Sequence, residues 1–190
     1  MMAPDLTGAL ATALAAVAER LREATVQVRG GARSASCGSG VVWRPGLVVT
    51  NAHVITGRSA TVETASGAVV ESQVVAHDPR RDLAVLRIAP ALAPAAEVAG
   101  RAPQVGALVV AVGNPLGLHG AVTAGIVHGR VVPRRGVPLL LADLQLLPGN
   151  SGGPLADALG RVVGINTMMV RGLAAAIPSE AVERFLERAA

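Results

Sequence analysis

The stretch Gly149-Asn150-Ser151-Gly152-Gly153-Pro154 places one hydroxyl side chain inside a run of glycines. Glycines have no side chain, so backbone N–H groups come close to whatever the serine attacks. A serine hydroxyl is a weak nucleophile by itself, and it needs a neighbouring base and a carboxylate that orients the base. The places of those two groups along the chain therefore decide how this stretch is interpreted.

A candidate base and a candidate carboxylate both lie upstream of Ser151. His53 comes shortly after the apolar run 47–49, which predicts that it lies where a strand ends. Asp82 directly precedes the mostly apolar run 83–88, which would anchor its backbone at a core. A carboxylate held there is able to fix one tautomer of an imidazole.

Asp78 competes with Asp82 for the carboxylate role. Pro79 follows it directly and indicates a turn. We therefore expect Asp82, and not Asp78, to face His53.

The order of these residues separates two readings of the glycine-flanked serine. Residues 149–153 also satisfy the G-x-S-x-G pattern of α/β-hydrolases, in which the histidine follows the serine. Here every histidine precedes Ser151, so the order is His, then Asp, then Ser, as in the chymotrypsin arrangement. The four histidines are His53, His77, His119 and His128.

Eight short segments, each weak by itself, occur in an order that is typical of one family. In chain order they are Gly38-Ser39-Gly40-Val41-Val42, Thr50-Asn51-Ala52-His53-Val54, Asp82-Leu83-Ala84-Val85-Leu86, Gly113-Asn114-Pro115-Leu116-Gly117, Val122-Thr123-Ala124-Gly125-Ile126-Val127, Gly149-Asn150-Ser151-Gly152-Gly153-Pro154-Leu155, Gly164-Ile165-Asn166-Thr167 and Ala176-Ile177-Pro178-Ser179. From about residue 25 to its end, the chain resembles trypsin-like serine proteases of the HtrA (high-temperature-requirement) branch. The resemblance implies a serine endopeptidase.

Residue order and resemblance together give each residue of the site an expected role. Ser151 is the expected nucleophile, His53 the general base and Asp82 the group that orients the imidazole. The backbone N–H groups of Gly149 and Ser151 are expected to form the oxyanion hole, and Asn150 supplies the peptide between them. The reaction would pass through an acyl-enzyme intermediate.

The expected substrates are proteins or peptides, unfolded ones among them. In trypsin-type enzymes that cleave after Arg or Lys, an acidic residue stands six positions before the serine, and here that residue is Gln145. We therefore predict cleavage after small or medium aliphatic residues, as the resemblance also implies. The expected substrate-binding residues are Leu146, Leu147, Asn166, Thr167 and Met168.

Short β-rich runs separated by glycine, proline and polar residues predict an all-β fold. They form two sets of six, which we interpret as two six-stranded antiparallel Greek-key barrels with a short helix at each end. The expected divisions are an N-terminal amphipathic helix over 1–24, a first barrel over 25–95, a second barrel over 96–178 and a C-terminal helix over 179–190. His53 and Asp82 then lie on one barrel and Ser151 on the other, so the three meet only at the interface.

The N-terminal segment has apolar residues at helical spacing and is predicted to be a structural helix. A secretory signal, the alternative, needs basic residues ahead of its apolar stretch, but Asp5 precedes the first basic residue, Arg20. No apolar run approaches the ~20 residues of a membrane span. The helical apolar residues are Leu6, Leu10, Leu14, Val17 and Leu21.

Composition weighs against several other classes of function. All 17 basic residues are arginines, the formal charge is +4 and aromatic residues make up only 1%. Scattered arginines with few aromatics disfavour nucleic-acid binding, although an arginine-mediated RNA binder stays as an alternative. The single cysteine, Cys37, excludes an intrachain disulfide, and the dispersed histidines predict no metal or other cofactor.

The chain departs from the HtrA pattern in four respects. HtrA proteins usually carry PDZ domains after the protease, and we expect none before the last residue here, Ala190. Their trimers use aromatic contacts, whereas this chain has only Trp43 and Phe185, so we expect a monomer or a small homo-oligomer. Leu147 replaces a usual asparagine near the oxyanion hole, and the segment 129–143 is short for an activation loop.

Two questions stay open at this point. The family is typically extracytoplasmic, but the sequence carries no recognisable export signal, so we assign no compartment. A catalytically latent protein-binding module with the same fold is the alternative to an active protease.

Overall fold

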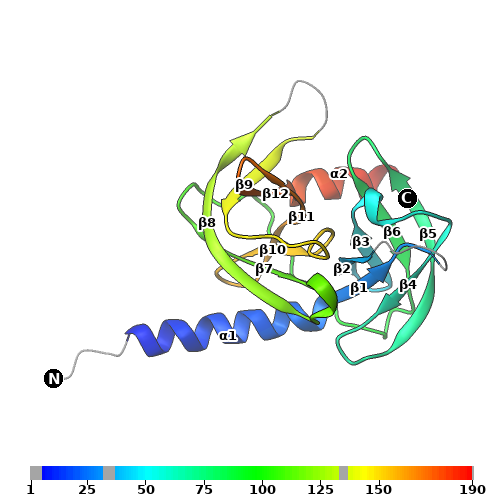
Figure 1. Ribbon diagram of the computed structural model, residues 1–190, viewed down its shortest axis with the longest axis horizontal. Helices are drawn as coiled ribbons and strands as arrows, with labels where there is room; N and C mark the ends of the chain where they lie inside the picture. The colour runs from blue at the N-terminus through cyan, green and yellow to red at the C-terminus, as the bar shows by residue number, and fades with distance from the viewer. Residues whose placement is uncertain (1–5, 32–36, 133–136, 190) are drawn as a thin grey trace.

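Two closed antiparallel barrels stand side by side with a helix at each end of the chain (Figure 1). The computed structural model describes residues 6–31, 37–132 and 137–189. This architecture confirms the all-β, two-barrel fold that the sequence predicts. The first barrel contains β1 (Thr25–Arg29), β2 (Cys37–Arg44), β3 (Leu47–Thr50), β4 (Ser59–Glu63), β5 (Val69–Asp78) and β6 (Leu83–Arg87). The second contains β7 (Leu108–Gly113), β8 (Ala121–Val131), β9 (Leu139–Asp143), β10 (Pro154–Asp157), β11 (Val162–Val170) and β12 (Leu173–Pro178).

The two barrels share one strand order. Around the first ring the order is β1-β2-β3-β6-β5-β4, and around the second it is β7-β8-β9-β12-β11-β10. The strands are rich in valine, whose β-branched side chain packs well on a pleated surface. Each barrel encloses its own apolar core, with Val28, Val48 and Leu86 in the first and Val109, Leu140 and Leu155 in the second.

A third apolar cluster joins the barrels along the interface between them, which we call the seam. Val41, Trp43 and Leu83 from the first barrel belong to the same cluster as Val112 and Ile165 from the second. These side chains are almost entirely buried, so water is excluded from the seam. Burial of this surface fixes how the ends of β3 and β6 face the loop before β10.

The helices cover the edges of the seam. The last turns of α1 (Leu6–Ala24) bury Val17 and Leu21 in the seam cluster, whereas its first turns extend beyond the barrels (Figure 1) and leave Leu10 exposed. α2 (Ser179–Ala189) buries Phe185 in the same cluster. Among the described residues, neither helix combines the length and apolarity that crossing a membrane requires.

The connection between the barrels contacts both of them. Within the segment 88–107, the Ala96 N–H donates to the Val42 carbonyl of the first barrel. Three residues later, the Ala99 N–H donates to the Val162 carbonyl of the second barrel. The chain therefore passes from one barrel to the other between these two bonds.

The contact between Trp43 and Glu183 gives a test of how α2 is attached. The Trp43 indole donates to Glu183 Oε1 over 2.7 Å, and the other carboxylate oxygen pairs with Arg44. The Glu183→Ala variant leaves the largely buried indole without its partner, so we expect a loss of about 1–3 kcal/mol in the free energy of unfolding. Urea unfolding followed by the fluorescence of the single tryptophan measures this loss.

Glu187→Ala is the matched control, because Glu187 is an exposed residue of the same helix. We expect its effect to stay within about 0.5 kcal/mol. Equal losses in the two variants would contradict a specific attachment through Trp43.

Candidate active site

His53 and Asp82 form a hydrogen-bonded pair at the end of the first barrel. His53 lies in a single helical turn, Ala52–Val54, that follows β3, and Asp82 directly precedes β6. His53 Nδ1 lies 2.9 Å from Asp82 Oδ1 and 3.0 Å from Oδ2, and the His53 N–H donates to Oδ1 over 3.1 Å. The His53 side chain is 51% exposed and that of Asp82 only 23%. The ring is thus open to a substrate, while the carboxylate that holds it is largely covered.

Asp82 adopts a backbone conformation that few residue types accept. Its φ is +54°, in the left-handed region, where aspartate and asparagine occur far more often than branched residues. The Asn51 side chain stabilises this backbone, because its Nδ2 donates to the Asp82 carbonyl over 2.9 Å. Asn51 stands two residues before His53, so one short segment supplies the imidazole and holds the backbone of its partner.

Asp78 makes its hydrogen bonds to residues other than His53. Its Oδ1 accepts from the backbone N–H groups of Arg80 and Arg81, as in a turn, and Oδ2 pairs with the Arg81 guanidinium. Asp78 therefore shapes the turn ahead of Asp82 and does not contact His53.

The electrostatics of the pair favour a charged carboxylate and a more basic imidazole. The hydrogen bond to Asp82 raises the pKa of His53, and this effect outweighs the partial burial that would lower it. Burial alone would raise the pKa of Asp82, but hydrogen bonds from His53 and Thr167 outweigh it and lower that pKa. Asp82 stays ionised at neutral pH and stabilises a proton on His53.

Thr167 connects this pair to Ser151 across the seam. Its Oγ1 donates to Asp82 Oδ2 over 2.6 Å, and its carbonyl accepts from Ser151 Oγ over 3.0 Å. The sequence predicts Thr167 as a wall of the substrate pocket, and this double contact was missed because nothing local to β11 indicates it. Ser151 Oγ makes no hydrogen bond to His53 within the described residues, and its partner there is the Thr167 carbonyl.

A tight turn shapes the backbone just before Ser151. The Asn150 N–H donates to the Leu147 carbonyl over 3.0 Å, with Pro148 and Gly149 at the two central positions. Gly149 has φ +105°, and proline followed by glycine with positive φ defines a type II turn. Relative to a type I turn, this rotates the Pro148–Gly149 peptide by about half a turn.

The N–H groups around Ser151 fall into two sets. Those of Asn150, Gly152 and Gly153 donate to the carbonyls of Leu147, Asn166 and Asn150, respectively. Those of Gly149 and Ser151 donate to no group in the part of the chain that the structure describes. These two N–H groups are therefore available to a bound oxyanion, whereas Asn150 contributes only the peptide between them.

Gly149 cannot be replaced without moving the neighbouring loop. A Cβ on this residue would lie 2.6 Å from the Asn114 carbonyl oxygen and 2.7 Å from Pro115 Cα. The positive φ adds strain for any other residue. Close packing against residues 114–115 thus requires glycine at this point of the turn.

The predicted substrate-binding residues lie in different environments. Leu147 and Met168 are about half exposed, at 47% and 49%, and Leu146 is partly buried. Asn166 is fully buried, and its Nδ2 donates to the Pro154 carbonyl over 2.9 Å. Asn166 therefore supports the start of β10, and the exposed side chains are the ones open to a substrate.

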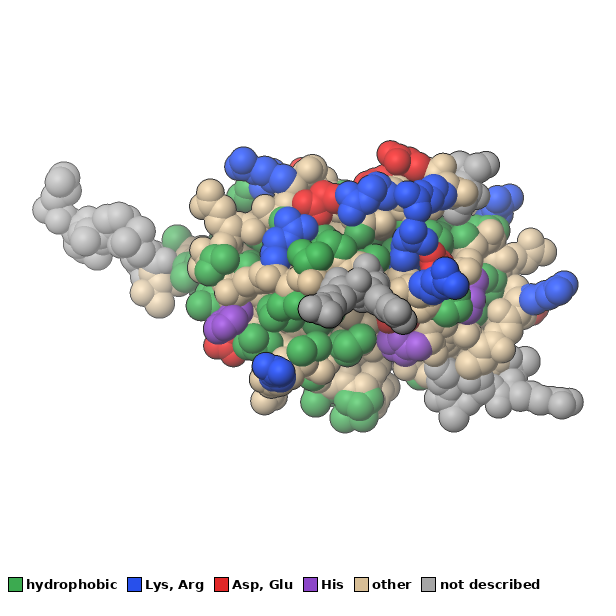
Figure 2. Space-filling model, turned by 90° about the horizontal axis from the view of Figure 1, so that it is seen from above, with side chains coloured by type: hydrophobic (Ala, Val, Ile, Leu, Met, Phe, Trp, Pro, Cys, Tyr) green, Lys and Arg blue, Asp and Glu red, His purple; other side chains and the backbone are tan. Residues whose placement is uncertain are grey.

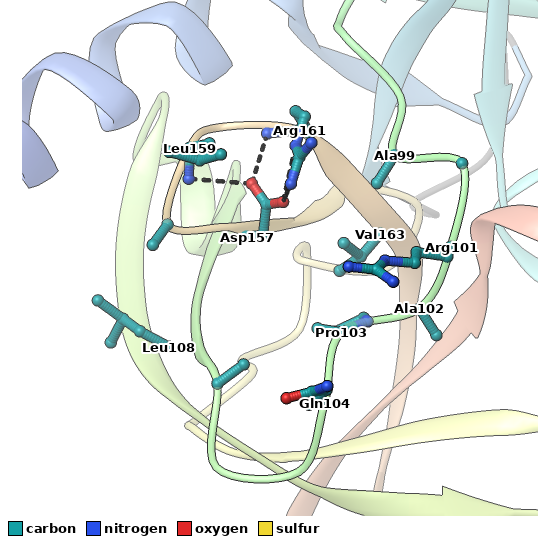
Figure 3. A pocket seen from close by; sticks show the side chains of 13 residues that line it. Ala99, Arg101, Ala102, Pro103, Gln104, Leu108, Asp157, Leu159, Arg161 and Val163 are labelled. Carbon is teal, nitrogen blue, oxygen red and sulfur yellow. Dashed lines mark hydrogen bonds and ion pairs between the residues drawn. The ribbon is translucent and has the colours of Figure 1, made fainter.

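A separate hollow of about 320 Å³ lies on the second barrel (Figure 3). Arg161 and the Leu159 N–H hold Asp157 at one end of it, so its buried charge is already paired. None of His53, Asp82 and Ser151 lines this hollow, and we assign it no chemistry.

The charged surface does not form one continuous basic face in the view of Figure 2. Arginine side chains gather along one edge there, with acidic side chains among them. Within the described ranges, no three His, Cys, Asp or Glu side chains come together as a possible metal site.

Comparison with known proteins gives this geometry a context. The family described as trypsin-like peptidase domain matches residues 38–165. Serine protease HTRA4 of Mus musculus is 38% identical over 92% of this chain and 40% of its own length. The putative serine protease HhoA of Synechocystis is 41% identical over 77% of this chain and 41% of its own length. The chain thus spans about two fifths of the length of these relatives.

Solved structures give the same result at the level of the fold. The serine endoprotease from Yersinia pestis superimposes with a TM-score of 0.81 and 32% identity, covering 91% of this chain and 65% of that one. The HtrA-type protease AlgW with a tripeptide gives a TM-score of 0.83 and 32% identity, covering 91% of this chain and 62% of that one.

The pKa of His53 offers a direct test of the pair. We expect the imidazole to titrate above the ordinary value of about 6.5, because Asp82 stabilises its charged form. In Asp82→Asn the pKa should fall, since the amide carries no negative charge. NMR titration of the imidazole resonances measures both values.

Asp78→Asn provides the matched control, because it removes a carboxylate of the same loop that contacts Arg81 instead of His53. The His53 titration should stay as in the unmodified chain. A pKa of His53 that moves equally in both variants would refute a specific pair.

Proposed function

This chain belongs to the family of trypsin-like peptidase domains, and from this premise we propose that it is a serine endopeptidase that acts through an acyl-enzyme. One observation carries the proposal. The two N–H groups that flank Asn150 are unpaired in the described structure and adjoin a hydroxyl that Thr167 links to the His53–Asp82 pair. Under this proposal, the seam supplies the four groups that acyl transfer requires, namely a nucleophile, a base, an orienting carboxylate and oxyanion donors.

The proposed reaction begins when Ser151 Oγ leaves the Thr167 carbonyl and turns to His53. Because Asp82 occupies Nδ1, the free Nε2 accepts the hydroxyl proton as Oγ bonds to the carbonyl carbon of the substrate. Asp82 stabilises the imidazolium that results. His53 then passes the proton to the leaving amine as the peptide bond breaks, and a water molecule hydrolyses the acyl-enzyme by the same steps in reverse.

The developing negative charge on the substrate oxygen is assigned to the N–H groups of Gly149 and Ser151. Donors that are already in place need no reorganisation when the charge forms, which is why such sites accelerate acyl transfer. The type II turn and its close packing on Asn114 support this assignment.

The pH dependence follows from the raised pKa of His53. The base has to be neutral in order to accept a proton, so activity is lost as the pH falls through that pKa. The acidic limb of the kcat/KM profile should therefore have its midpoint above about 6.5.

A latent binding module is the second candidate, and one observation favours it. Ser151 Oγ is bonded to the Thr167 carbonyl and not to His53. A hydroxyl that stayed there would leave the nucleophile unactivated. Labelling with a fluorophosphonate separates the two candidates, because only an activated Ser151 reacts faster than the denatured chain does.

The Ser151→Ala variant tests the nucleophile. We expect the rate of hydrolysis of an unfolded protein or a fluorogenic peptide to fall on the order of 10⁴-fold, because no acyl-enzyme forms. Fluorophosphonate labelling should be lost as well, while the unfolding transition stays close to that of the unmodified chain. Continued proteolysis by this variant would exclude Ser151 as the nucleophile.

Cleavage preference is a separate proposal, for small or medium aliphatic residues on the acyl side of the cleaved bond. Gln145 stands where a buried acid would recognise a basic side chain, and the half-exposed Leu147 and Met168 offer apolar contacts. In a peptide library we expect Val, Ala, Leu and Ile to exceed Arg and Lys at that position by about tenfold or more. A profile dominated by basic residues would overturn this preference.

A further inference from the structure

Ser39 stands at the point where the first barrel meets the loop that carries Ser151. It lies on β2, within the segment Gly38-Ser39-Gly40, and no part of its side chain is exposed. A Cβ on Gly38 would lie 2.9 Å from the Ser151 carbonyl oxygen, which shows how closely β2 approaches the loop. The mechanism above gives Ser39 no role.

All three polar atoms of Ser39 are engaged, and two of them, N and Oγ, contact the loop of Ser151. Its N–H donates to the Ser151 carbonyl over 2.8 Å, and Oγ contacts the Gly149 carbonyl over 2.7 Å. The Asn114 N–H donates to the same Oγ over 2.8 Å. The Ser39 carbonyl accepts from Thr50 Oγ1 over 2.6 Å.

The direction of the bond between Ser39 and Gly149 follows from this set. A hydroxyl carries one proton and also accepts hydrogen bonds. The Asn114 N–H is necessarily a donor to Ser39 Oγ, and the Gly149 carbonyl is necessarily an acceptor. The single hydroxyl proton of Ser39 therefore points at the Gly149 oxygen.

That bond fixes the peptide between the two oxyanion donors. The Gly149 carbonyl belongs to the Gly149–Asn150 peptide, with the Gly149 N–H on one side and the Ser151 N–H on the other. The turn bond from the Asn150 N–H to the Leu147 carbonyl holds the other edge of this peptide. With both edges held, the peptide that joins the two donors is fixed, which restricts how far either donor can turn away from the substrate oxygen.

We propose that the Ser39 hydroxyl is a positioning residue that holds the oxyanion turn in its working orientation from the opposite barrel. This inference rests on the proposed function. The proposed donors come from the second barrel, but their orientation depends on a side chain of the first. The hole is then correctly formed only when the two barrels are packed together.

Ser39→Ala tests the proposal by removing the hydroxyl and leaving two buried backbone groups, the Gly149 carbonyl and the Asn114 N–H, without that partner. We expect kcat to fall about 10- to 100-fold, the range that a lost buried hydrogen bond produces when the turn relaxes. KM should change less than about twofold, because the oxyanion contact forms mainly in the transition state. The affinity of a peptide aldehyde, which forms the tetrahedral adduct, should fall with kcat, whereas that of the product peptide should not.

Ser72→Ala is the matched control. Ser72 is 2% exposed, and its hydroxyl donates to the Ala60 carbonyl over 2.8 Å within the first barrel, away from the loop of Ser151. The Ser72→Ala variant loses the same kind of buried hydrogen bond as Ser39→Ala. We therefore expect a comparable decrease in the free energy of unfolding and an unchanged kcat. Both variants are compared with the unmodified chain at a temperature where all three are folded.

Ser39→Cys serves as a second variant of similar shape with a weaker donor. Its kcat should lie between those of the unmodified chain and Ser39→Ala, and it tests the proposal by itself if the alanine variant does not fold. A kcat for Ser39→Ala equal to that of Ser72→Ala, or a fully active Ser39→Cys, would overturn the proposal.

The amide resonance of Gly149 gives a readout that does not depend on turnover. In ¹H–¹⁵N spectra, Ser39→Ala should shift this resonance and speed its hydrogen exchange, and Ser72→Ala should do neither. If the unmodified chain showed neither proteolysis nor labelling of Ser151, the proposed function would be refuted. A Gly149 resonance that Ser39→Ala leaves in place would refute the role of Ser39 alone.

Discussion

The packing of the two barrels against each other is the constraint on which the site depends. His53 and Asp82 extend from the ends of strands in one barrel, and Ser151 lies on a loop of the other. The apolar seam buries Trp43, Leu83 and Ile165 together and so sets the distance between these elements. Polar contacts then refine the fit, from Thr167 to Asp82 in one direction and from Ser39 to Gly149 in the other. Apolar burial stabilises the contact between the barrels, and the hydrogen bonds fix how the two barrels are aligned with each other.

Selective use of backbone hydrogen bonds distinguishes the loop around Ser151 from an ordinary turn. Most backbone N–H groups of folded proteins are paired, because a buried unpaired one costs about 1–3 kcal/mol. In this loop the N–H groups of Asn150, Gly152 and Gly153 are satisfied within the protein, while those of Gly149 and Ser151 have no partner among the described residues. In the proposed reaction, the substrate oxygen would bind both of these N–H groups.

Much of the architecture was predictable from the sequence, because strands and turns follow local patterns. β-rich runs of the predicted spacing became two six-stranded barrels, and the turn that Pro79 indicates lies between Asp78, the last residue of β5, and Asp82, which directly precedes β6. The hydrogen bonds of the site were not predictable in the same way. Ser39 and Gly149 are 110 positions apart, and their contact depends on how two complete barrels pack. The segments around Ser39 and Asn51 were recognised as motifs, but without coordinates a motif does not reveal which atom each side chain contacts. The rotamer of Ser151, directed at Thr167, depends in the same way on the packed seam.

The left-handed backbone of Asp82 restricts how this site can evolve. The proposed reaction requires a carboxylate there, and the φ of +54° independently disfavours β-branched and bulky residues. Glutamate would keep the charge but lacks the short side chain that makes aspartate tolerable in this conformation. In a homologue that no longer needs the proposed activity, asparagine and glycine are therefore the substitutions at Asp82 that the backbone accepts most easily. A homologue with asparagine or glycine at this position and an otherwise unchanged barrel would be expected to keep the fold and to lack the proposed activity.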